Sequence, residues 1–167
     1  MRYDYVETPL GRMLVMSDAG RLVGLHFRED RHQPMLEQAW TRDSGDAVIE
    51  RTRQQLAEYF AGTRREFDVP MEPRGTPFQQ RVWTVLTEIP YGTTTTYGRM
   101  AQRLGQPTAT RAVGAANGRN PISILVPCHR AIGADGSLTG YAGGLERKKA
   151  LLELEQAWGT RTGDLFA

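Results

Sequence analysis

The chain has 167 residues, of which 40% are hydrophobic and 24% are charged, and its formal net charge is +2. This balance is typical of a soluble globular protein of one ordinary domain or two small ones. It excludes a membrane protein, since no apolar run approaches the roughly 18 residues of a transmembrane helix. The N-terminus has no signal-peptide pattern, and a single cysteine is present. Together these features predict a cytoplasmic protein with no membrane partner.

The first part of the chain begins with strands and continues into a helix. Strand-like apolar runs occupy residues 2–6, 13–17 and 22–27. Asp18-Ala19-Gly20 is a turn signal between the second and third runs and predicts a hairpin. A helix is expected from an N-cap at Asp46 to Gly62, and residues 66–69 suggest a further short strand. Since no catalytic spacing occurs here, we interpret this part as a scaffold.

A clear helix start opens the second part. Thr76 is placed as the N-cap, Pro77 occupies the first helical position, and Gln79 follows three residues after the cap, which is a capping box. Apolar residues then recur at helical spacing until Pro90 ends the helix.

Two shorter helices follow. Apolar spacing predicts one over residues 97–104, which Gly105 ends, and another over residues 109–118. Two short helices joined by a glycine-containing turn are typical of a helix-turn-helix.

The last of these helices has an unusually bare surface, because alanine and glycine dominate it and Arg111 is its one long side chain near the start. Glycine inside a helix costs roughly 1 kcal/mol relative to alanine. Close approach of another molecule would explain such bareness, and a nucleic-acid groove is one candidate. Tight packing against a neighbouring helix would explain it equally well.

Charge is unevenly distributed. Residues 89–134 contain no Asp or Glu but five arginines: Arg99, Arg103, Arg111, Arg119 and Arg130. A positive segment in a nearly neutral chain favours a face that binds anions, with phosphate backbone the most probable anion. An ordinary solvated surface is the alternative.

Cys128 follows a short apolar run, 122–126, which predicts a buried strand or extended core segment. A lone cysteine is most often an inert buried residue. The adjoining His129 and Arg130 favour a reactive thiolate instead, because cationic neighbours lower the pKa of a thiol. A final helix is expected over residues 145–158, on which Glu155 could point inward.

Four motifs with fixed spacing carry a resemblance to a known family: Arg111-Ala112-Val113-Gly114, Asn120-Pro121, Pro127-Cys128-His129-Arg130 and Gly140-Tyr141-Ala142-Gly143-Gly144-Leu145. The chain resembles the methylated-DNA–protein-cysteine S-methyltransferases, also called O6-alkylguanine-DNA alkyltransferases. The similarity runs from about Gly75 to Glu155, while residues 1–74 resemble the family only in length and outline. The resemblance implies an α+β protein. Residues 1–74 form a small ribonuclease H-like domain of sheet and helix, and residues 75–167 form a mainly helical, winged helix-turn-helix-like domain.

The function that the resemblance implies is suicidal DNA repair. Such a protein binds double-stranded DNA through the minor groove and flips an O6-alkylated guanine into a pocket. It then moves the alkyl group onto its own cysteine, and O4-alkylthymine is a further possible substrate. The product is a thioether with no easy reverse path, so each molecule acts once. The protein is also expected to be a monomer.

The resemblance also assigns roles at the reacting centre. Cys128 matches the alkyl acceptor, His129 the base that takes the thiol proton through a water, and Glu155 the carboxylate that orients the imidazole. Tyr97 matches a phenol that donates a hydrogen bond to the flipped guanine, and Asn120 matches a side chain that braces the turn beneath the pocket.

Further residues match positions that contact DNA or the base. Arg111 matches the finger that fills the place of the flipped base. The other expected DNA-binding residues are Tyr97, Ala112, Arg119 and Arg130. The expected pocket residues are Tyr141, Ala142, Ala131 and Ser123, with backbone groups near Ala131 and Ala142 reading the guanine edge. Some relatives bind a structural zinc through N-terminal cysteines, which this chain lacks, so no metal and no cofactor are expected.

Two alternatives from other functional classes remain. The first is a helix-turn-helix DNA-binding regulator whose Cys128 is inert or senses alkylation, which predicts dimers and sequence-specific binding. The second is a hydrolase with a Cys-His dyad, which would turn over many times and would need an oxyanion hole.

Overall fold

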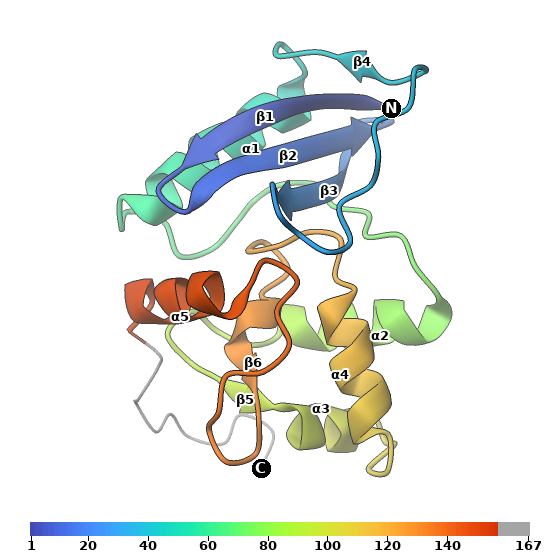
Figure 1. The fold of residues 1–167 in the computed structure, drawn as a ribbon, viewed down its shortest axis with the longest axis vertical. Coiled ribbons are helices and arrows are strands. Elements are labelled where there is room, and N and C mark those ends of the chain that lie inside the picture. Colours follow the sequence, from blue (N-terminus) through green and yellow to red (C-terminus); the bar gives the residue numbers. More distant parts are fainter. Residues whose placement is uncertain (157–167) are drawn as a thin grey trace. The chain divides into compact units, whose positions relative to one another are not determined.

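The computed structural model of the chain describes residues 1–156, and these form two compact units (Figure 1). The first unit contains Met1–Arg74 together with Pro121–Leu125. The second contains Gly75–Asn120 and the chain from Val126 onward. A division at residue 74 alone therefore leaves out Pro121–Leu125, which we call the returning segment.

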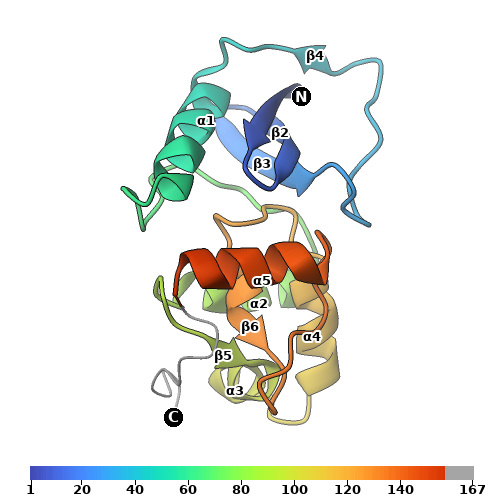
Figure 2. The same ribbon diagram turned by 60° about the vertical axis from the view of Figure 1, so that its left-hand side comes forward.

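The first unit is a four-stranded sheet with one helix on a face. Its elements are β1 (Arg2–Thr8), β2 (Gly11–Asp18), β3 (Arg21–Phe27), β4 (Thr41–Arg42) and α1 (Ala47–Phe60). The strand order is β3-β2-β1-β4, with β4 parallel to β1 and the other pairs antiparallel. The expected hairpin between β2 and β3 is confirmed, and Gly20 adopts a φ of 77° in its turn, which glycine tolerates without strain. Helix α1 packs against β1 and β2 (Figure 2).

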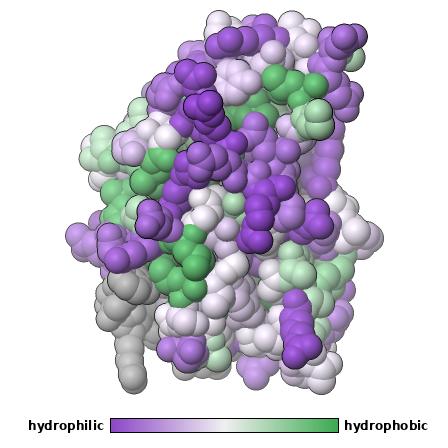
Figure 3. Space-filling view, viewed as in Figure 1, coloured by the Kyte–Doolittle hydropathy of each residue, from purple (hydrophilic) through white to green (hydrophobic). Residues whose placement is uncertain are grey.

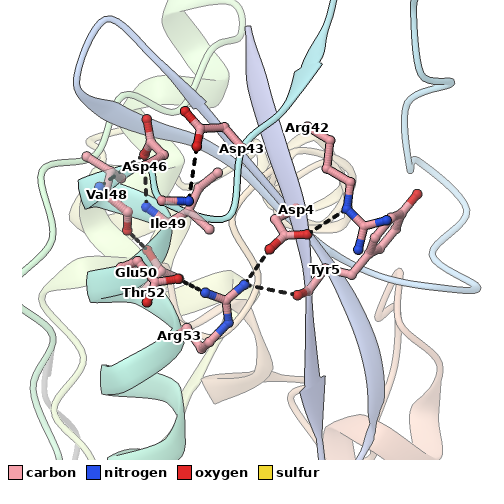
Figure 4. Close-up of polar contacts among 11 residues, drawn as sticks. Asp4, Tyr5, Arg42, Asp43, Asp46, Val48, Ile49, Glu50, Thr52 and Arg53 are labelled. Carbon is pink, nitrogen blue, oxygen red and sulfur yellow. Dashed lines mark hydrogen bonds and ion pairs between the residues drawn. The ribbon is translucent and has the colours of Figure 1, made fainter.

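An ion-pair network fixes α1 to the sheet (Figure 4). Asp46 caps the helix as expected, because its Oδ1 accepts from two backbone N–H groups of the first turn at 3.0 Å each. Asp4, a buried residue of β1, accepts from Arg53 of α1 at 2.6 Å and from Arg42 of β4 at 2.9 Å. A buried carboxylate needs such partners to remain ionised.

The free edge of β3 is paired by two separate segments. Near its start, Leu22 N donates to the Pro70 carbonyl and Leu22 O accepts from Glu72 N, both at 2.8 Å. The strand expected over residues 66–69 is absent, because the Gln55 side chain bonds both backbone polar groups of Asp68.

The returning segment pairs with the other end of β3. Leu25 N donates to the Pro121 carbonyl at 2.9 Å, and Ser123 N donates to the Leu25 carbonyl at 3.0 Å. The strand expected over residues 122–126 is therefore reduced to a single bridge. Ile124, with a φ of 71°, turns the backbone away from the ladder. This conformation is rare for a β-branched residue.

The second unit carries helices α2 to α5 and the cysteine. Its elements are α2 (Pro77–Thr87), β5 (Thr95–Thr96), α3 (Tyr97–Arg103), α4 (Thr110–Gly118), the 3-10 turn η1 (Cys128–Arg130), β6 (Ala131–Ile132) and α5 (Leu145–Leu154). The expected capping box at Thr76 and Gln79 is present, and α3 and α4 lie side by side (Figure 2). Helix α5 ends at Leu154, earlier than expected, and residues 157 and 158 of that expectation lie outside the described residues.

Buried apolar side chains from four helices form the core of this unit: Val82, Trp83, Leu86, Met100, Val113, Ala116, Leu151 and Leu152. Helix α5 also packs against η1, the turn that carries the cysteine. No helix in the described part of the chain is long and apolar enough to span a membrane.

Candidate active site

Cys128 is held at the start of η1, where its side chain is almost fully buried (4% exposed). Its backbone N–H donates to the Val126 carbonyl at 2.8 Å. Its carbonyl accepts from the backbone N–H of Ala131 and from Asn117 Nδ2, the latter at 3.3 Å. These three hydrogen bonds hold the backbone that carries the thiol.

His129 and Glu155 form a buried pair next to this cysteine. The His129 Nε2 and a Glu155 carboxylate oxygen lie 2.7 Å apart, and both side chains are fully buried. Since a carboxylate only accepts, Nε2 carries the hydrogen and Nδ1 presents its lone pair. Nδ1 has no hydrogen-bond partner among the described residues. Burial keeps the pKa of His129 below its usual value despite the opposing Glu155 charge, so the ring is a neutral base at pH 7.

The Glu155 carboxylate is itself held by Arg130. Arg130 Nε donates to one Glu155 oxygen at 2.8 Å, and its Nη2 donates to the other at 3.1 Å. Burial alone would raise the pKa of Glu155, but hydrogen bonds from His129 and Arg130, together with the charge of Arg130, lower it well below its usual value. Because His129 is neutral, Arg130 is the counter-charge that keeps Glu155 ionised.

Arg130, one of the expected DNA-binding residues, points into the protein. Its side chain is 8% exposed, and its Nη1 donates to the Ile89 carbonyl at 2.7 Å. Sequence adjacency to Cys128 does not show the direction of a side chain. The inward turn of η1 commits this guanidinium to Glu155.

Tyr97 lies at the start of α3, and its hydroxyl is part of a second, partly buried cluster. The hydroxyl donates to the Thr139 carbonyl at 2.9 Å. Lys148 of α5 approaches the same hydroxyl at 3.4 Å and donates to the carbonyls of Ala131 and Thr139 at 2.6 and 2.7 Å. The Lys148 side chain is completely buried.

Sequence reasoning missed Lys148, although a signal for it existed. Lys148, Leu151, Leu152 and Glu155 recur at helical spacing, so they share one face of α5. Two charged residues seven positions apart on an otherwise apolar face indicate a buried polar function.

The other expected site residues differ in their burial and in their hydrogen bonds. Asn120 is buried and its Nδ2 donates to the Val126 carbonyl at 2.8 Å, which links the two ends of the returning segment. Tyr141 is buried and Ala142 half-buried, on the loop that precedes α5. The Ala131 N–H is already bonded to Cys128, so it cannot also read a base. Ser123 belongs to the first unit, where its N–H bonds Leu25.

The exposed side of α4 is as bare as the sequence suggests, and the surface over it is pale to light green with few hydrophilic side chains (Figure 3). Arg111, Ala112 and Arg119 are exposed. A Cβ added at Gly114 or Gly118 would meet nothing within 4 Å among the described residues. Tight packing inside the protein therefore does not explain these two glycines.

Two protein-family models match the chain. Residues 1–73 match the model described as "6-O-methylguanine DNA methyltransferase, ribonuclease-like domain", and residues 77–157 match "6-O-methylguanine DNA methyltransferase, DNA binding domain". The chain belongs to this methyltransferase family. The resemblance noted from the motifs is thereby confirmed, as is the α+β fold with a ribonuclease-like first domain. The N-terminal part resembles the family in more than length and outline.

Individual relatives agree with the family models. The chain is 48% identical over 157 residues to a methylated-DNA–protein-cysteine methyltransferase of Mycobacterium tuberculosis, which covers 94% of this chain and 93% of that protein. It is 46% identical to the protein of the same name from Methanosarcina acetivorans, over 93% of this chain and 98% of that protein. A crystal structure of M. tuberculosis OGT in complex with DNA superimposes with a TM-score of 0.87 at 48% identity, covering 93% of each chain.

The buried ammonium of Lys148 gives this family member a measurable pH signature. Burial lowers the pKa of Lys148 to about 8, against 10.5 for an ordinary lysine, a shift that corresponds to roughly 3 kcal/mol. Between these values the unfolded chain holds the proton and the folded chain does not. Stability from this group therefore rises as the pH increases from 8 to 10.5.

We expect the free energy of unfolding of Lys148→Met, measured by denaturant titration, to lack this rise, so the difference from the unaltered chain grows across that interval. Lys149→Met is the matched control, because its neighbouring ammonium is exposed. A rise that persists in Lys148→Met would contradict the assignment.

Proposed function

We propose that this protein repairs O6-alkylguanine in double-stranded DNA by transferring the alkyl group irreversibly to Sγ of Cys128. The observation that carries the proposal is the buried His129–Glu155–Arg130 array beside the chain's single cysteine. Membership of the 6-O-methylguanine DNA methyltransferase family supports it. O4-alkylthymine is a second substrate of the same chemistry.

The chemistry follows from the hydrogen-bond pattern. Glu155 holds the hydrogen of His129 on Nε2, so the Nδ1 lone pair is available to take the Cys128 proton through a water. The thiolate attacks the alkyl carbon, the S–C bond forms, and the C–O6 bond breaks. Guanine leaves with the electron pair, and Tyr97 donates a hydrogen bond to it. Imidazolium formed in the step is stabilised by Glu155. The thioether cannot revert, so each molecule reacts once.

Access to the base comes from α4. Its exposed Arg111 and Ala112, the exposed Arg119 directly after it and its two unobstructed glycines suit a helix that approaches the minor groove closely. Arg111 enters the duplex as the target guanine leaves the stack, and the alkylated pair opens at lower cost than a normal one. The protein acts as a monomer, and a reducing cytoplasm keeps its thiol active.

Intact mass spectrometry tests the activity directly. After incubation with a duplex containing O6-methylguanine, the protein mass should rise by one methyl group in place of the thiol hydrogen. A tryptic map should place the methyl group on the peptide containing Cys128. An unmodified thiol together with multiple turnovers would favour the hydrolase, and sequence-specific binding without uptake would favour the regulator.

Arg111→Ala should slow repair of a duplex lesion strongly, because no side chain remains to fill the vacated place. The measurement is the single-turnover rate of methyl transfer. Arg53 is a poor surface control, since it pairs with buried Asp4. Arg21→Ala is the better one, because Arg21 is exposed on β3. Equal rates for Arg111→Ala and Arg21→Ala would contradict the finger role.

The salt dependence of DNA binding should be modest. Of the five arginines in residues 89–134, Arg103 pairs with Glu88 and Arg130 with Glu155. Arg99 is half-buried on α3, and Arg111 and Arg119 are exposed. Each phosphate contact contributes about −0.9 to the slope of log K against log[salt]. We therefore expect a slope no steeper than about −3 in a fluorescence-anisotropy titration, and a slope near −5 would show that the paired arginines also contact DNA.

A further inference from the structure

The guanidinium of Arg130 is fixed on three acceptors, none of which is the thiol. Its place two residues after Cys128 favours activation of the thiol by a cationic neighbour. In the structure, Nε and Nη2 donate to the Glu155 carboxylate at 2.8 and 3.1 Å, and Nη1 donates to the Ile89 carbonyl at 2.7 Å. Its Cζ lies 5.8 Å from the centre of the Tyr91 ring. The charge of Arg130 is therefore directed to Glu155.

One oxygen of Glu155 serves two nitrogens at once. Oε2 lies 2.7 Å from Nε2 of His129 and 3.1 Å from Nη2 of Arg130. Since both nitrogens contact the same oxygen, they lie within the ~6 Å over which one charge moves the pKa of another group by about 1–3. An oxygen that already neutralises a guanidinium offers less negative charge to an imidazolium. Arg130 thus weakens the support that Glu155 gives to a proton on His129.

The balance of charge in this buried site leads to the same conclusion. The charges of Glu155 and Arg130 cancel, so a proton on the fully buried His129 leaves a net positive charge away from water, which is costly. Burial lowers the pKa of His129, Glu155 opposes this, and the charges of Arg130 and of Lys148 on α5 act in the same direction as burial. Helix α2 also packs against η1, and the residues that it buries are not titratable. Without the guanidinium, an imidazolium would become the counter-charge of Glu155.

We propose that Arg130 is a positioning residue: by occupying the Glu155 carboxylate it makes His129 a weaker base, and so it restrains the thiol instead of activating it. The inference rests on the proposed function, in which His129 takes the thiol proton. Arg130 touches neither the alkyl group nor the guanine. Because the thiolate is the form that reacts with other electrophiles and with oxidants, the restraint preserves a thiol that each molecule uses once.

The pH dependence of thiol alkylation tests the sign of this effect. Iodoacetamide is the probe: the Cys128 thiolate forms an S–C bond, the C–I bond breaks, and iodide leaves. Arg130→Gln removes the charge but keeps an amide donor. We expect it to lower the pH midpoint of alkylation by about one pH unit or more, so that alkylation well below the midpoint becomes about tenfold faster or more. Nuclear magnetic resonance should show that the His129 ring takes up its proton at a higher pH.

Two further variants separate charge from shape. Arg130→Lys keeps the charge and should change the alkylation rate by less than about threefold. Lys149→Gln is the matched control, because it removes a half-exposed ammonium from α5, and it should leave the midpoint unchanged. In a Glu155→Gln background, Arg130→Gln should move the midpoint much less, since no carboxylate remains to be released.

Other results would overturn the proposal. A higher midpoint in Arg130→Gln would show that the guanidinium activates the thiol directly, and an unchanged midpoint would show that it is only structural. An equal fall in Arg130→Lys, or an equal fall in the Glu155→Gln background, would exclude the route through the carboxylate. Should Arg130→Gln fail to fold in a thermal melt, the unaltered chain still gives a test. Its His129 ring should be mostly neutral at pH 6.5, where an ordinary histidine is half protonated, and a protonated ring there would overturn the proposal.

Failure of the proposed function has its own signature. The unaltered chain would then take up no methyl group from an O6-methylguanine duplex. Alkylation by iodoacetamide needs no DNA and releases no guanine, so the midpoints of the Arg130 variants are measured independently of that result.

Discussion

Cys128→Ser protein takes up no methyl group from an O6-methylguanine duplex, yet it binds the duplex with nearly unchanged affinity. We expect this separation because the thiol is proposed to do chemistry and not binding. A serine hydroxyl has a far higher pKa than a thiol and is a much weaker nucleophile toward an sp3 carbon. Cys128 is also 4% exposed, so its side chain offers little surface to DNA. Intact mass spectrometry measures the uptake, and fluorescence anisotropy measures the affinity.

Serine is the suitable replacement because it keeps the backbone hydrogen bonds that hold η1, including those from Asn117 and Ala131 to the residue 128 carbonyl. A parallel loss of uptake and affinity would contradict the division of labour between Cys128 and α4. Methyl uptake on any other residue of the serine variant would contradict the assignment of the acceptor.

Glu155→Ala is expected to cost about 3–5 kcal/mol of stability, because it leaves the buried Arg130 guanidinium without its counter-charge. The same change removes the acceptor that fixes the His129 tautomer, so the alkyl-transfer rate should also fall sharply. Denaturant titration at pH 7 measures the first effect and single-turnover kinetics the second. Glu155→Gln, which retains the shape, should show a smaller loss of stability.

The difference in stability between Glu155→Ala and the unaltered chain should depend on pH. Since the pKa of Glu155 is lowered in the folded chain, its contribution is present above the ordinary carboxyl pKa and is lost as the pH falls below it. The difference between Glu155→Ala and the unaltered chain should therefore shrink in acid.

Glu153→Ala is the matched control for both measurements. Glu153 lies on the same helix, but its side chain is 56% exposed and its nearest cation, Lys149, is 3.9 Å away. Surface pairs of this kind contribute little. Equal destabilisation by the two alanine variants would show that helix α5, and not the buried array, accounts for the loss.

Sequence patterns predicted helix caps and turns well, because these features depend on residues close together in the sequence. The capping box at Thr76, the N-cap at Asp46 and the turn at Gly20 each depend on residues a few positions apart, so they can be recognised in the sequence. The strand expected over residues 66–69 is absent, and residues 122–126, expected as a buried strand or extended core segment, are buried but form only one bridge, because a partner distant in sequence decided the pairing. The Gln55 side chain forms hydrogen bonds with the backbone of Asp68, and Ile122 forms only a single bridge with β3.

The sequence by itself determined which side chains this protein has for its chemistry. The single cysteine beside a histidine and the ordered set of motifs are features of the sequence and do not depend on how the chain folds. Only the tertiary structure decided what each charge does. Arg130 and Lys148 both read as surface cations, and both are buried, one against Glu155 and the other against two carbonyl oxygens. Burial depends on the packing of α5 against η1, which joins segments about twenty residues apart, and no local rule of propensity or spacing contains that contact.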